Sequence, residues 1–315
     1  MDAIRKPDPP LIALVAFALA TALPVCEAVW RDAARDRNLP VRITLPAGEG
    51  PVPVVLWSPG VGGDRRSGGV WAAAWAGDGL AVVQMEHPGS DAAVYRPDGT
   101  PEQKRARLAA AITPAQLQAR VDDARFILSE LVWRRDMPGC DLGRIDAGRA
   151  AIAGHSMGAW AVQGLAGQRF ATPDGDAPLL RDQRFRAAIA FSPTAAPGSD
   201  AFRRVGIPFL IITGTLDGAT ATSAPEERAK ALATRTAAYP SMPADGGKCL
   251  LVFADATHMM FAGNRRADTV LAQHVESVSL AATTDFLRAA LAGEPQAIRL
   301  GLREKLAPND RLACK

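Results

Sequence analysis

Short apolar runs alternate along the chain with stretches of helical periodicity, and this alternation constrains the fold more than any other feature. The helical stretches are residues 114–133 and a segment near the carboxyl end marked by Val275, Val278, Ala282 and Phe286. Strands that alternate with helices form a parallel sheet covered on both faces. We therefore predict an α/β protein with a mostly parallel central sheet. Residues 41–45 alternate like a half-exposed strand, and the apolar runs are residues 52–57, 80–85, 150–153, 187–191, 208–213 and 250–253.

The composition is that of a globular protein. Of 315 residues, 48% are hydrophobic and 22% are charged, and the formal net charge of +3 is spread along the chain. The densest basic stretch, Lys104-Arg105-Ala106-Arg107, lacks the interleaved aromatic residues of a nucleic-acid surface. We interpret it as a solvated helix face and expect no nucleic-acid partner. No linker divides residues 29–315, so we predict one domain there.

The first 28 residues have the layout of a secretory signal peptide. Arg5 and Lys6 precede an apolar run over residues 11–23, and Cys26-Glu27-Ala28 offers small residues at the positions a signal peptidase inspects. The run is short for a bilayer span, so we expect no stable membrane segment, although an uncleaved anchor is the alternative. The sequence therefore predicts cleavage after Ala28 and a secreted or periplasmic protein.

Cleavage after Ala28 would leave three cysteines. Cys249 precedes the last predicted strand and Cys314 lies near the chain end, so we predict a disulfide between them and a free Cys140. The cysteines show no C-x-x-C spacing and the four histidines are scattered. We expect no metal site.

The string Gly154-x-Ser156-x-Gly158 stands between an apolar strand and a helix of small residues. A serine hydroxyl is a weak nucleophile that must be exposed, aimed and deprotonated. Two glycines permit the tight strand-to-helix turn that lifts such a serine above the sheet edge. The alternative is a glycine-rich turn in which Ser156 caps the helix. We predict Ser156 as a nucleophile.

A general base for Ser156 can be sought among four histidines. His258 directly follows the last apolar run, and parallel sheets place reactive groups in such loops. His155 lies inside the turn, where its side chain should point away from the base. His87 follows an early strand and His274 lies within the final helix. We predict His258 as the base.

The acid that orients His258 should also follow a strand. Asp217 comes directly after the run at residues 208–213, and the order Ser156, Asp217, His258 is nucleophile, acid, base. An ordinary Asp-Gly turn is the alternative for Asp217. Asp255, three residues before His258, is a local rival that we expect instead to order its own turn by accepting backbone N–H bonds.

A developing oxyanion needs two fixed N–H donors. The backbone N–H of Met157 begins the helix after Ser156, and the glycine-rich segment Pro59-Gly60-Val61-Gly62-Gly63 follows an early strand. We predict the N–H groups of Met157 and Val61 as the oxyanion hole. A dinucleotide site is the alternative for the glycines, but Gly60-x-Gly62-x-x-Arg65 lacks the third glycine.

These strings resemble the dienelactone-hydrolase-like branch of the α/β hydrolases, and within it the bacterial relatives of platelet-activating-factor acetylhydrolase. The resemblance covers residues 41–291 and implies the α/β-hydrolase fold, a Ser–Asp–His triad, no cofactor, and ester substrates. Those substrates range from short-acyl esters to phospholipid acetyl groups and polyesters. Relatives often have His where Pro59 stands, and dienelactone hydrolase proper has a Cys where Ser156 stands, so dienelactone is not the expected substrate. The strings are Ser58-Pro59-Gly60-Val61-Gly62-Gly63, His87-Pro88-Gly89-Ser90-Asp91, Gly154-His155-Ser156-Met157-Gly158, Gly214-Thr215-Leu216-Asp217 and Ala256-Thr257-His258-Met259.

Together these features predict a serine carboxylic-ester hydrolase that acts through an acyl-enzyme on small-molecule or lipid esters. An acyltransferase with the same triad is the alternative enzyme, and a non-catalytic binding protein has no need for the three residues together. The insert at residues 167–186 is polar, and nothing between Ser156 and His258 predicts a long apolar lid. We therefore expect short-acyl substrates.

Overall fold

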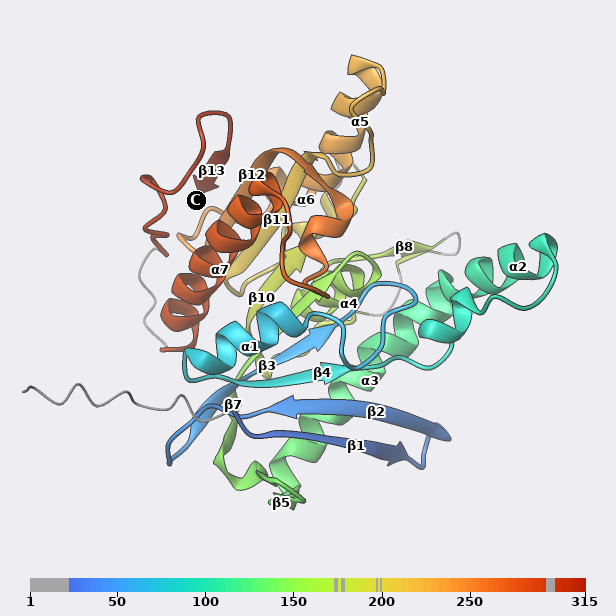
Figure 1. The fold of residues 1–315 in the computed structure, drawn as a ribbon, viewed down its shortest axis with the longest axis vertical. Coiled ribbons are helices and arrows are strands. Elements are labelled where there is room, and N and C mark those ends of the chain that lie inside the picture. Colours follow the sequence, from blue (N-terminus) through green and yellow to red (C-terminus); the bar gives the residue numbers. More distant parts are fainter. Residues whose placement is uncertain (1–22, 173–174, 177–178, 197, 199, 293–297) are drawn as a thin grey trace, which may run out of the picture.

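The computed structural model describes residues 23–172, 175–176, 179–196, 198, 200–292 and 298–315. Its centre is a nine-stranded sheet in the order β1-β2-β4-β3-β7-β10-β11-β12-β13 (Figure 1). The strands are β1 (Val25–Asp32), β2 (Arg37–Thr44), β3 (Val52–Ser58), β4 (Ala81–Met85), β7 (Ile145–His155), β10 (Phe185–Phe191), β11 (Phe209–Leu216), β12 (Lys248–Thr257) and β13 (Arg311–Cys314).

The six central strands, in the sheet order β4-β3-β7-β10-β11-β12, pair in parallel, which confirms the predicted mostly parallel sheet. The outer pairs β1–β2, β2–β4 and β12–β13 are antiparallel. All the predicted apolar runs lie wholly or largely in strands of this sheet. Because parallel strands end at the same edge, the loops after β3, β7, β11 and β12 meet at one edge of the sheet.

Helices cover both faces of the sheet, which is why its central strands are apolar on both sides. On one face lie α1 (Gly69–Gly77) and α7 (Val270–Leu291), with a core that includes Trp57, Trp75 and Phe286. On the other lie α3 (Pro114–Trp133) and α4 (Met157–Ala166), with Val121 and Val162 in the core (Figure 1).

Two helices project from the body on either side of the edge where the loops meet (Figure 1). On α2 (Pro101–Ala111), Lys104, Arg105 and Ala106 are exposed as predicted, whereas Arg107 is half-buried and donates to the carbonyl oxygens of residues 94, 96 and 98. α5 (Pro225–Thr236) buries none of its residues. The remaining elements are α6 (Ala238–Ser241), η1 (Ala92–Tyr95), η2 (Leu142–Arg144), η3 (Asp200–Phe202), η4 (His258–Phe261), β5 (Asp136–Met137), β6 (Cys140–Asp141), β8 (Ala171–Thr172) and β9 (Gly175–Asp176).

The predicted boundary between residues 28 and 29 falls inside β1. β1 pairs with β2 over its whole length, from Val25 opposite Thr44 to Asp32 opposite Arg37. Cleavage after Ala28 would remove half of this strand. The predicted leader up to residue 22 lies outside the described residues. Within the described part of the chain, no helix is long and apolar enough to cross a bilayer.

Two disulfides join distant parts of the chain. Cys249 on β12 bonds to Cys314 on β13, which confirms that predicted pair. The prediction of a free Cys140 is wrong, because Cys140 bonds to Cys26 on β1. Cleavage after Ala28 would discard Cys26, so the second disulfide also requires an earlier start to the folded domain.

Candidate active site

Ser156 lies on the tight turn between β7, which ends at His155, and α4, which begins at Met157. Its backbone has φ 56° and ψ −116°, a conformation that non-glycine residues rarely adopt. Ser156 stands at the N-cap of α4, yet its side chain makes no capping hydrogen bond. The capping interpretation is therefore wrong, and the hydroxyl lines a cavity instead.

The two flanking glycines are required by close backbone contacts. A Cβ atom on Gly154 would lie 2.7 Å from the Ser58 carbonyl oxygen, and one on Gly158 would lie 1.9 Å from the same atom. Any larger residue at either position would push the turn away from the end of β3. The Gly-x-Ser-x-Gly pattern is thus explained by packing against Ser58.

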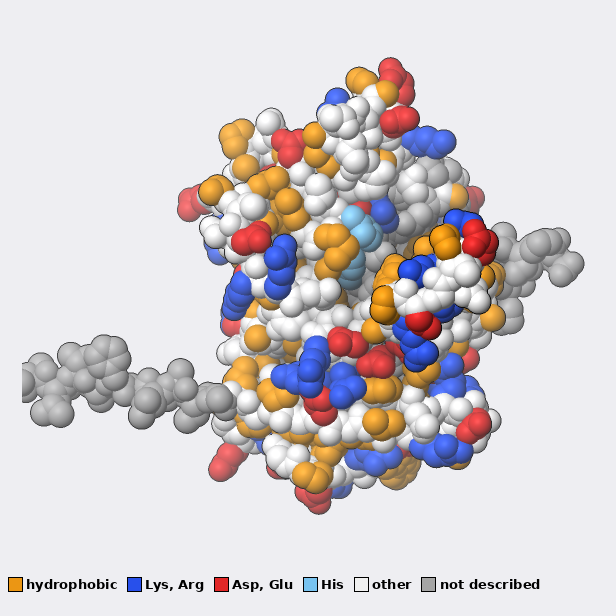
Figure 2. Space-filling model, turned by 45° about the vertical axis from the view of Figure 1, so that its right-hand side comes forward, with side chains coloured by type: hydrophobic (Ala, Val, Ile, Leu, Met, Phe, Trp, Pro, Cys, Tyr) orange, Lys and Arg blue, Asp and Glu red, His pale blue; other side chains and the backbone are white. Residues whose placement is uncertain are grey.

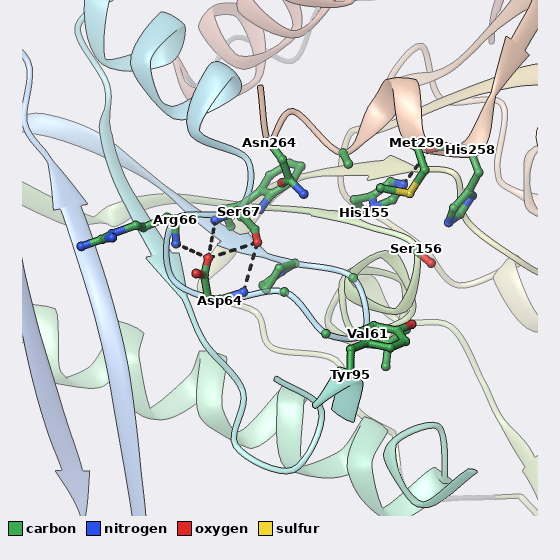
Figure 3. A pocket seen from close by; sticks show the side chains of 16 residues that line it. Val61, Asp64, Arg66, Ser67, Tyr95, His155, Ser156, His258, Met259 and Asn264 are labelled. Carbon is green, nitrogen blue, oxygen red and sulfur yellow. Dashed lines mark hydrogen bonds between the residues drawn. The ribbon is translucent and has the colours of Figure 1, made fainter. Parts of the chain in front are cut away.

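His258 and Asp217 come together from neighbouring strands. His258 begins η4 directly after β12, and Asp217 directly follows β11. His258 Nδ1 donates to Asp217 Oδ1 over 2.7 Å, which leaves Nε2 as the nitrogen able to accept a proton. The ring of His258 lies beside Ser156 in the same cavity (Figure 3).

Asp217 is held as a buried anion by three partners. Thr213 Oγ1 donates to Oδ2 over 2.7 Å, and Arg235 Nε lies 3.0 Å from Oδ1, the oxygen that also accepts from His258. Burial raises the pKa of Asp217, but the hydrogen bond from His258 and the charge of Arg235 outweigh it and hold this pKa below its usual value. The carboxylate is therefore ionised at neutral pH.

Arg235 also fixes the loop after β10. Its Nη1 donates to the Ser192 carbonyl oxygen over 3.0 Å and to Thr194 Oγ1 over 2.7 Å. Because Arg235 lies on the exposed helix α5, this single side chain ties that helix to the acid and to the neighbouring loop.

The prediction that His155 points away from the base is wrong. The rings of His155 and His258 lie 4.6 Å apart between centroids, and His155 Nε2 donates to the His258 carbonyl oxygen over 3.0 Å. Burial and the neighbouring His258 lower the pKa of His155 to about 3. His155 is therefore a neutral support for the backbone of His258.

Asp255 does not compete with Asp217 for His258. It is exposed, has φ 56°, and its own N–H donates to Thr215 Oγ1 over 2.8 Å. Among the described residues its carboxylate accepts no backbone N–H, so the expected turn-ordering role is also wrong. The strained backbone at Asp255 instead marks the irregularity in the pairing of β11 with β12.

The glycine-rich segment at residues 59–63, here called the oxyanion loop, closes the cavity next to Ser156. A Cβ atom on Gly60 would lie 3.4 Å from the Ser156 Cβ, which shows how closely the loop approaches. The Val61 N–H has no hydrogen-bond partner among the described residues, and the Met157 N–H, at the start of α4, has no intrahelical acceptor. Both predicted donors are thus free for a ligand.

The cavity has a volume of about 500 Å³, and both polar and apolar side chains line it. Figure 3 shows Ser156, His258 and His155 on one side and Ser67 and Asn264 on the other. Figure 2 shows histidine side chains in a hollow of this face, beside exposed apolar side chains. Within the described residues no cluster of three or more His, Cys, Asp or Glu could hold a metal ion.

Several contributors to this site had no clear signal in the sequence. Arg235 lies in a polar helix 18 positions beyond Asp217, and only the fold brings the two together. Tyr95 lines the cavity, and its ring would collide with a Cβ on Gly62. Thr213 lies four residues before Asp217 at the end of an apolar run, a position that could have suggested an inward-facing hydroxyl.

Known structures with the same fold include two hydrolases. A 2,6-dihydroxy-pseudo-oxynicotine hydrolase matches with a TM-score of 0.54 and 14% identity, over 89% of this chain and 72% of that chain. Dienelactone hydrolase from Anabaena variabilis ATCC 29413 matches with a TM-score of 0.51 and 16% identity, over 82% and 96%. No protein-family model and no curated protein sequence matches. The chain has the α/β-hydrolase fold, as predicted.

The buried histidines predict how stability depends on pH. Burial lowers the pKa of His155 to about 3 and that of His87 to about 4, from 6.5 in an unfolded chain. Below pH 6.5 the unfolded chain therefore binds more protons, so the free energy of unfolding falls as the pH falls. Each histidine contributes about 1.4 kcal/mol per pH unit between about pH 6 and 5.

His155→Gln, which keeps a donor for the His258 carbonyl, should remove one of these two contributions to the pH dependence. Urea unfolding at a series of pH values measures it, and an unchanged slope would contradict the assignment.

Proposed function

We propose that the protein is a serine carboxylic-ester hydrolase that works through an acyl-enzyme. The observation that carries the proposal is the convergence of Ser156, on its strained turn, with the hydrogen-bonded pair of His258 and Asp217 at one cavity. The fold and the two hydrolases that share it add support.

The proposed reaction has two acyl-transfer steps. His258 Nε2 takes the proton from Ser156 as its oxygen attacks the ester carbonyl, and the buried Asp217 carboxylate stabilises the imidazolium that forms. The N–H groups of Val61 and Met157 donate to the tetrahedral oxyanion. His258 then protonates the leaving alcohol, and water, activated by the same base, releases the acid and restores Ser156.

Hydrolysis is preferred over transfer to another alcohol because water reaches the base. The His258 side chain is 30% exposed at the cavity mouth. An acyltransferase would need to exclude water from this position. Acyl transfer in the presence of added alcohol remains the alternative activity of the same triad, and product analysis distinguishes the two.

We propose short-acyl esters as the substrates. The cavity of about 500 Å³ carries the polar side chains of Ser67 and Asn264 on the side opposite Ser156. A phospholipid acetyl group or an ester bond of a polyester also presents a small reacting group and is the alternative within this class. The exposed Tyr95 and Met259 at the rim offer apolar surface to the rest of such a molecule.

We propose that the protein is exported, because two disulfides persist best in an oxidising compartment. Ala20-Thr21-Ala22 places small residues at the positions a signal peptidase inspects and leaves Cys26 in the folded domain. Mass spectrometry of the amino terminus should therefore find Leu23 first when the full chain is expressed in a secreting bacterium. A chain that retains Met1 in the cytoplasm would contradict export.

Ser156→Ala should abolish ester turnover while the fold is kept, because no other group at this position can form the acyl-enzyme. The expected loss is on the order of 10⁶-fold in kcat, the cost of deleting the nucleophile of such a triad. Hydrolysis of 4-nitrophenyl acetate measures it, with circular dichroism as the control for folding. Activity above about a tenth of wild type would contradict the assignment.

Asp217→Asn and Asp255→Asn form a matched pair that tests the acid. Asp217→Asn should lower kcat/KM by about a thousandfold or more, since the equivalent change in a Ser-His-Asp protease costs ~10⁴. Asp255→Asn changes an exposed side chain and should cost less than about tenfold. The reverse ranking, measured by steady-state kinetics on the same ester, would exclude Asp217 as the acid.

A panel of 4-nitrophenyl esters tests the acyl preference. Acetyl and butyryl esters should give the highest kcat/KM, because the polar far side of the cavity offers little apolar contact to a longer chain. A rate that climbs through octanoyl to palmitoyl esters, or that jumps when micelles form, would contradict this preference.

A further inference from the structure

A buried network beneath the oxyanion loop has the same order of groups as the active site. Ser58 Oγ lies 2.9 Å from His87 Nε2, and His87 Nδ1 lies 3.0 Å from Asp123 Oδ2. All three side chains are fully buried, so no substrate reaches Ser58 and the array cannot be a second ester site.

The donors and acceptors at the two ends fix the direction of every hydrogen bond. An ionised carboxylate only accepts, so His87 Nδ1 donates to Asp123 and Nε2 must accept from the Ser58 hydroxyl. An arginine only donates, so Arg120 Nη1, 3.4 Å away, donates to Ser58 Oγ. The chain of donation therefore runs from Arg120 through Ser58 and His87 to Asp123.

The charges agree with this direction. Burial and the charge of Arg120 lower the pKa of His87 to about 4, against the opposite effect of Asp123, so His87 is neutral. Burial lowers the pKa of Arg120 to about 9, still above neutral pH, so the guanidinium stays charged. Asp123 also pairs with Arg37 and Arg35 at the turn between β1 and β2. The network thus places a fixed positive charge at its Arg120 end.

Arg120 uses that end to hold the oxyanion loop. From α3, its guanidinium donates to the carbonyl oxygens of Pro59 over 2.6 Å and Gly60 over 3.2 Å. Its Nε donates to Ser90 Oγ over 2.9 Å, and the Ser90 carbonyl accepts the Gly62 N–H over 2.8 Å. One buried side chain therefore anchors the loop directly on one side of Val61, and through Ser90 on the other.

The Gly60 carbonyl oxygen accepts from Arg120 and also from the Gly63 N–H over 3.2 Å, and these two hydrogen bonds together determine where the Val61 N–H points. The Gly60 carbonyl and the Val61 N–H belong to one planar trans peptide, so they point in opposite directions. With the carbonyl oxygen drawn down to Arg120, the N–H faces away from the buried network. This is the N–H that lacks a partner among the described residues, on the loop that contacts Ser156.

We propose that Arg120 is a positioning residue that orients the peptide between Gly60 and Val61, so that the Val61 N–H meets the developing oxyanion. The Ser58–His87–Asp123 array keeps Arg120 in place by committing the Ser58 proton to His87 and leaving its lone pairs for the guanidinium. This proposal rests on the proposed esterase function, because it assigns a purpose to a donor of that reaction.

Arg120→Lys keeps the charge but cannot hold both carbonyl oxygens, so it isolates the orienting role. With 4-nitrophenyl acetate, kcat should fall about ten- to a hundredfold, less than the ~10²–10³ for complete loss of an oxyanion donor. KM should stay within about threefold, and affinity for a trifluoromethyl ketone, which forms a tetrahedral adduct, should fall by the same factor as kcat. Arg125→Lys is the matched control, because Arg125 also lies on α3 and donates to a carbonyl, that of Leu180, away from the loop.

Ser58→Ala removes a single hydroxyl group and is the second test variant, to be used if Arg120→Lys does not fold. It should lower kcat and ketone affinity together by about threefold or more, since it breaks the link between Arg120 and His87. A folded variant with unchanged kcat and ketone affinity, or a loss confined to KM, would overturn the positioning role.

Amide NMR separates this proposal from the esterase assignment. If the wild-type protein hydrolyses no ester, the proposed function fails, yet the orientation of the loop can still be measured. Arg120→Lys should shift the amide resonances of Gly60 and Val61 while those around Leu180 stay unchanged. Unchanged Gly60 and Val61 amides would overturn the positioning role even in an active esterase.

Discussion

The register between β3 and β7 is the constraint on which the rest of the site depends. Ser58, the last residue of β3, pairs with Gly154 near the end of β7, so the oxyanion loop and the Ser156 turn leave the sheet side by side. The Ser58 carbonyl oxygen then leaves no room for a Cβ on Gly154 or Gly158. This contact requires a glycine on each side of Ser156 and brings Ser156, the proposed nucleophile, next to residues 59–63, which hold one of the proposed oxyanion donors. A shift of one residue in the β3–β7 register would disrupt both the contacts at the two glycines and the placement of Ser156 beside the oxyanion loop.

Two hydrogen-bonded networks of charged side chains support different parts of the site, one at His258 and one at the oxyanion loop. One network joins Arg235, Asp217 and His258, and its carboxylate is kept ionised beside the His258 ring. The other joins Arg120 to the Ser58–His87–Asp123 array and supports the oxyanion loop. Each contains an arginine, an aspartate and a histidine, but His87 is fully buried whereas the His258 side chain is 30% exposed. Exposure rather than side-chain type therefore separates the proposed base, His258, from the buried His87.

Sequence patterns predicted the parts of the fold that local rules govern. Ser156, Asp217 and His258 each follow an apolar run, and a parallel sheet must bring such positions to one edge. The start of β1 was missed because Cys26-Glu27-Ala28 satisfies the rule for a cleavage site as well as the alternation of a strand. The Cys26–Cys140 disulfide, Arg235 and Arg120 depend on contacts between distant segments. No local pattern specifies these, and the position of His155 beside His258 likewise involves a contact between segments 103 residues apart.

Ser156 is proposed as the nucleophile of an acyl-enzyme. Labelling with a fluorophosphonate, which reacts preferentially with activated serines, tests this assignment without knowledge of the natural substrate. We expect a single adduct by intact-protein mass spectrometry, mapped by peptide sequencing to Ser156. We also expect the adduct to be lost in the wild-type protein when a short-acyl ester competes. No adduct on folded protein, or an adduct on another serine, would contradict it.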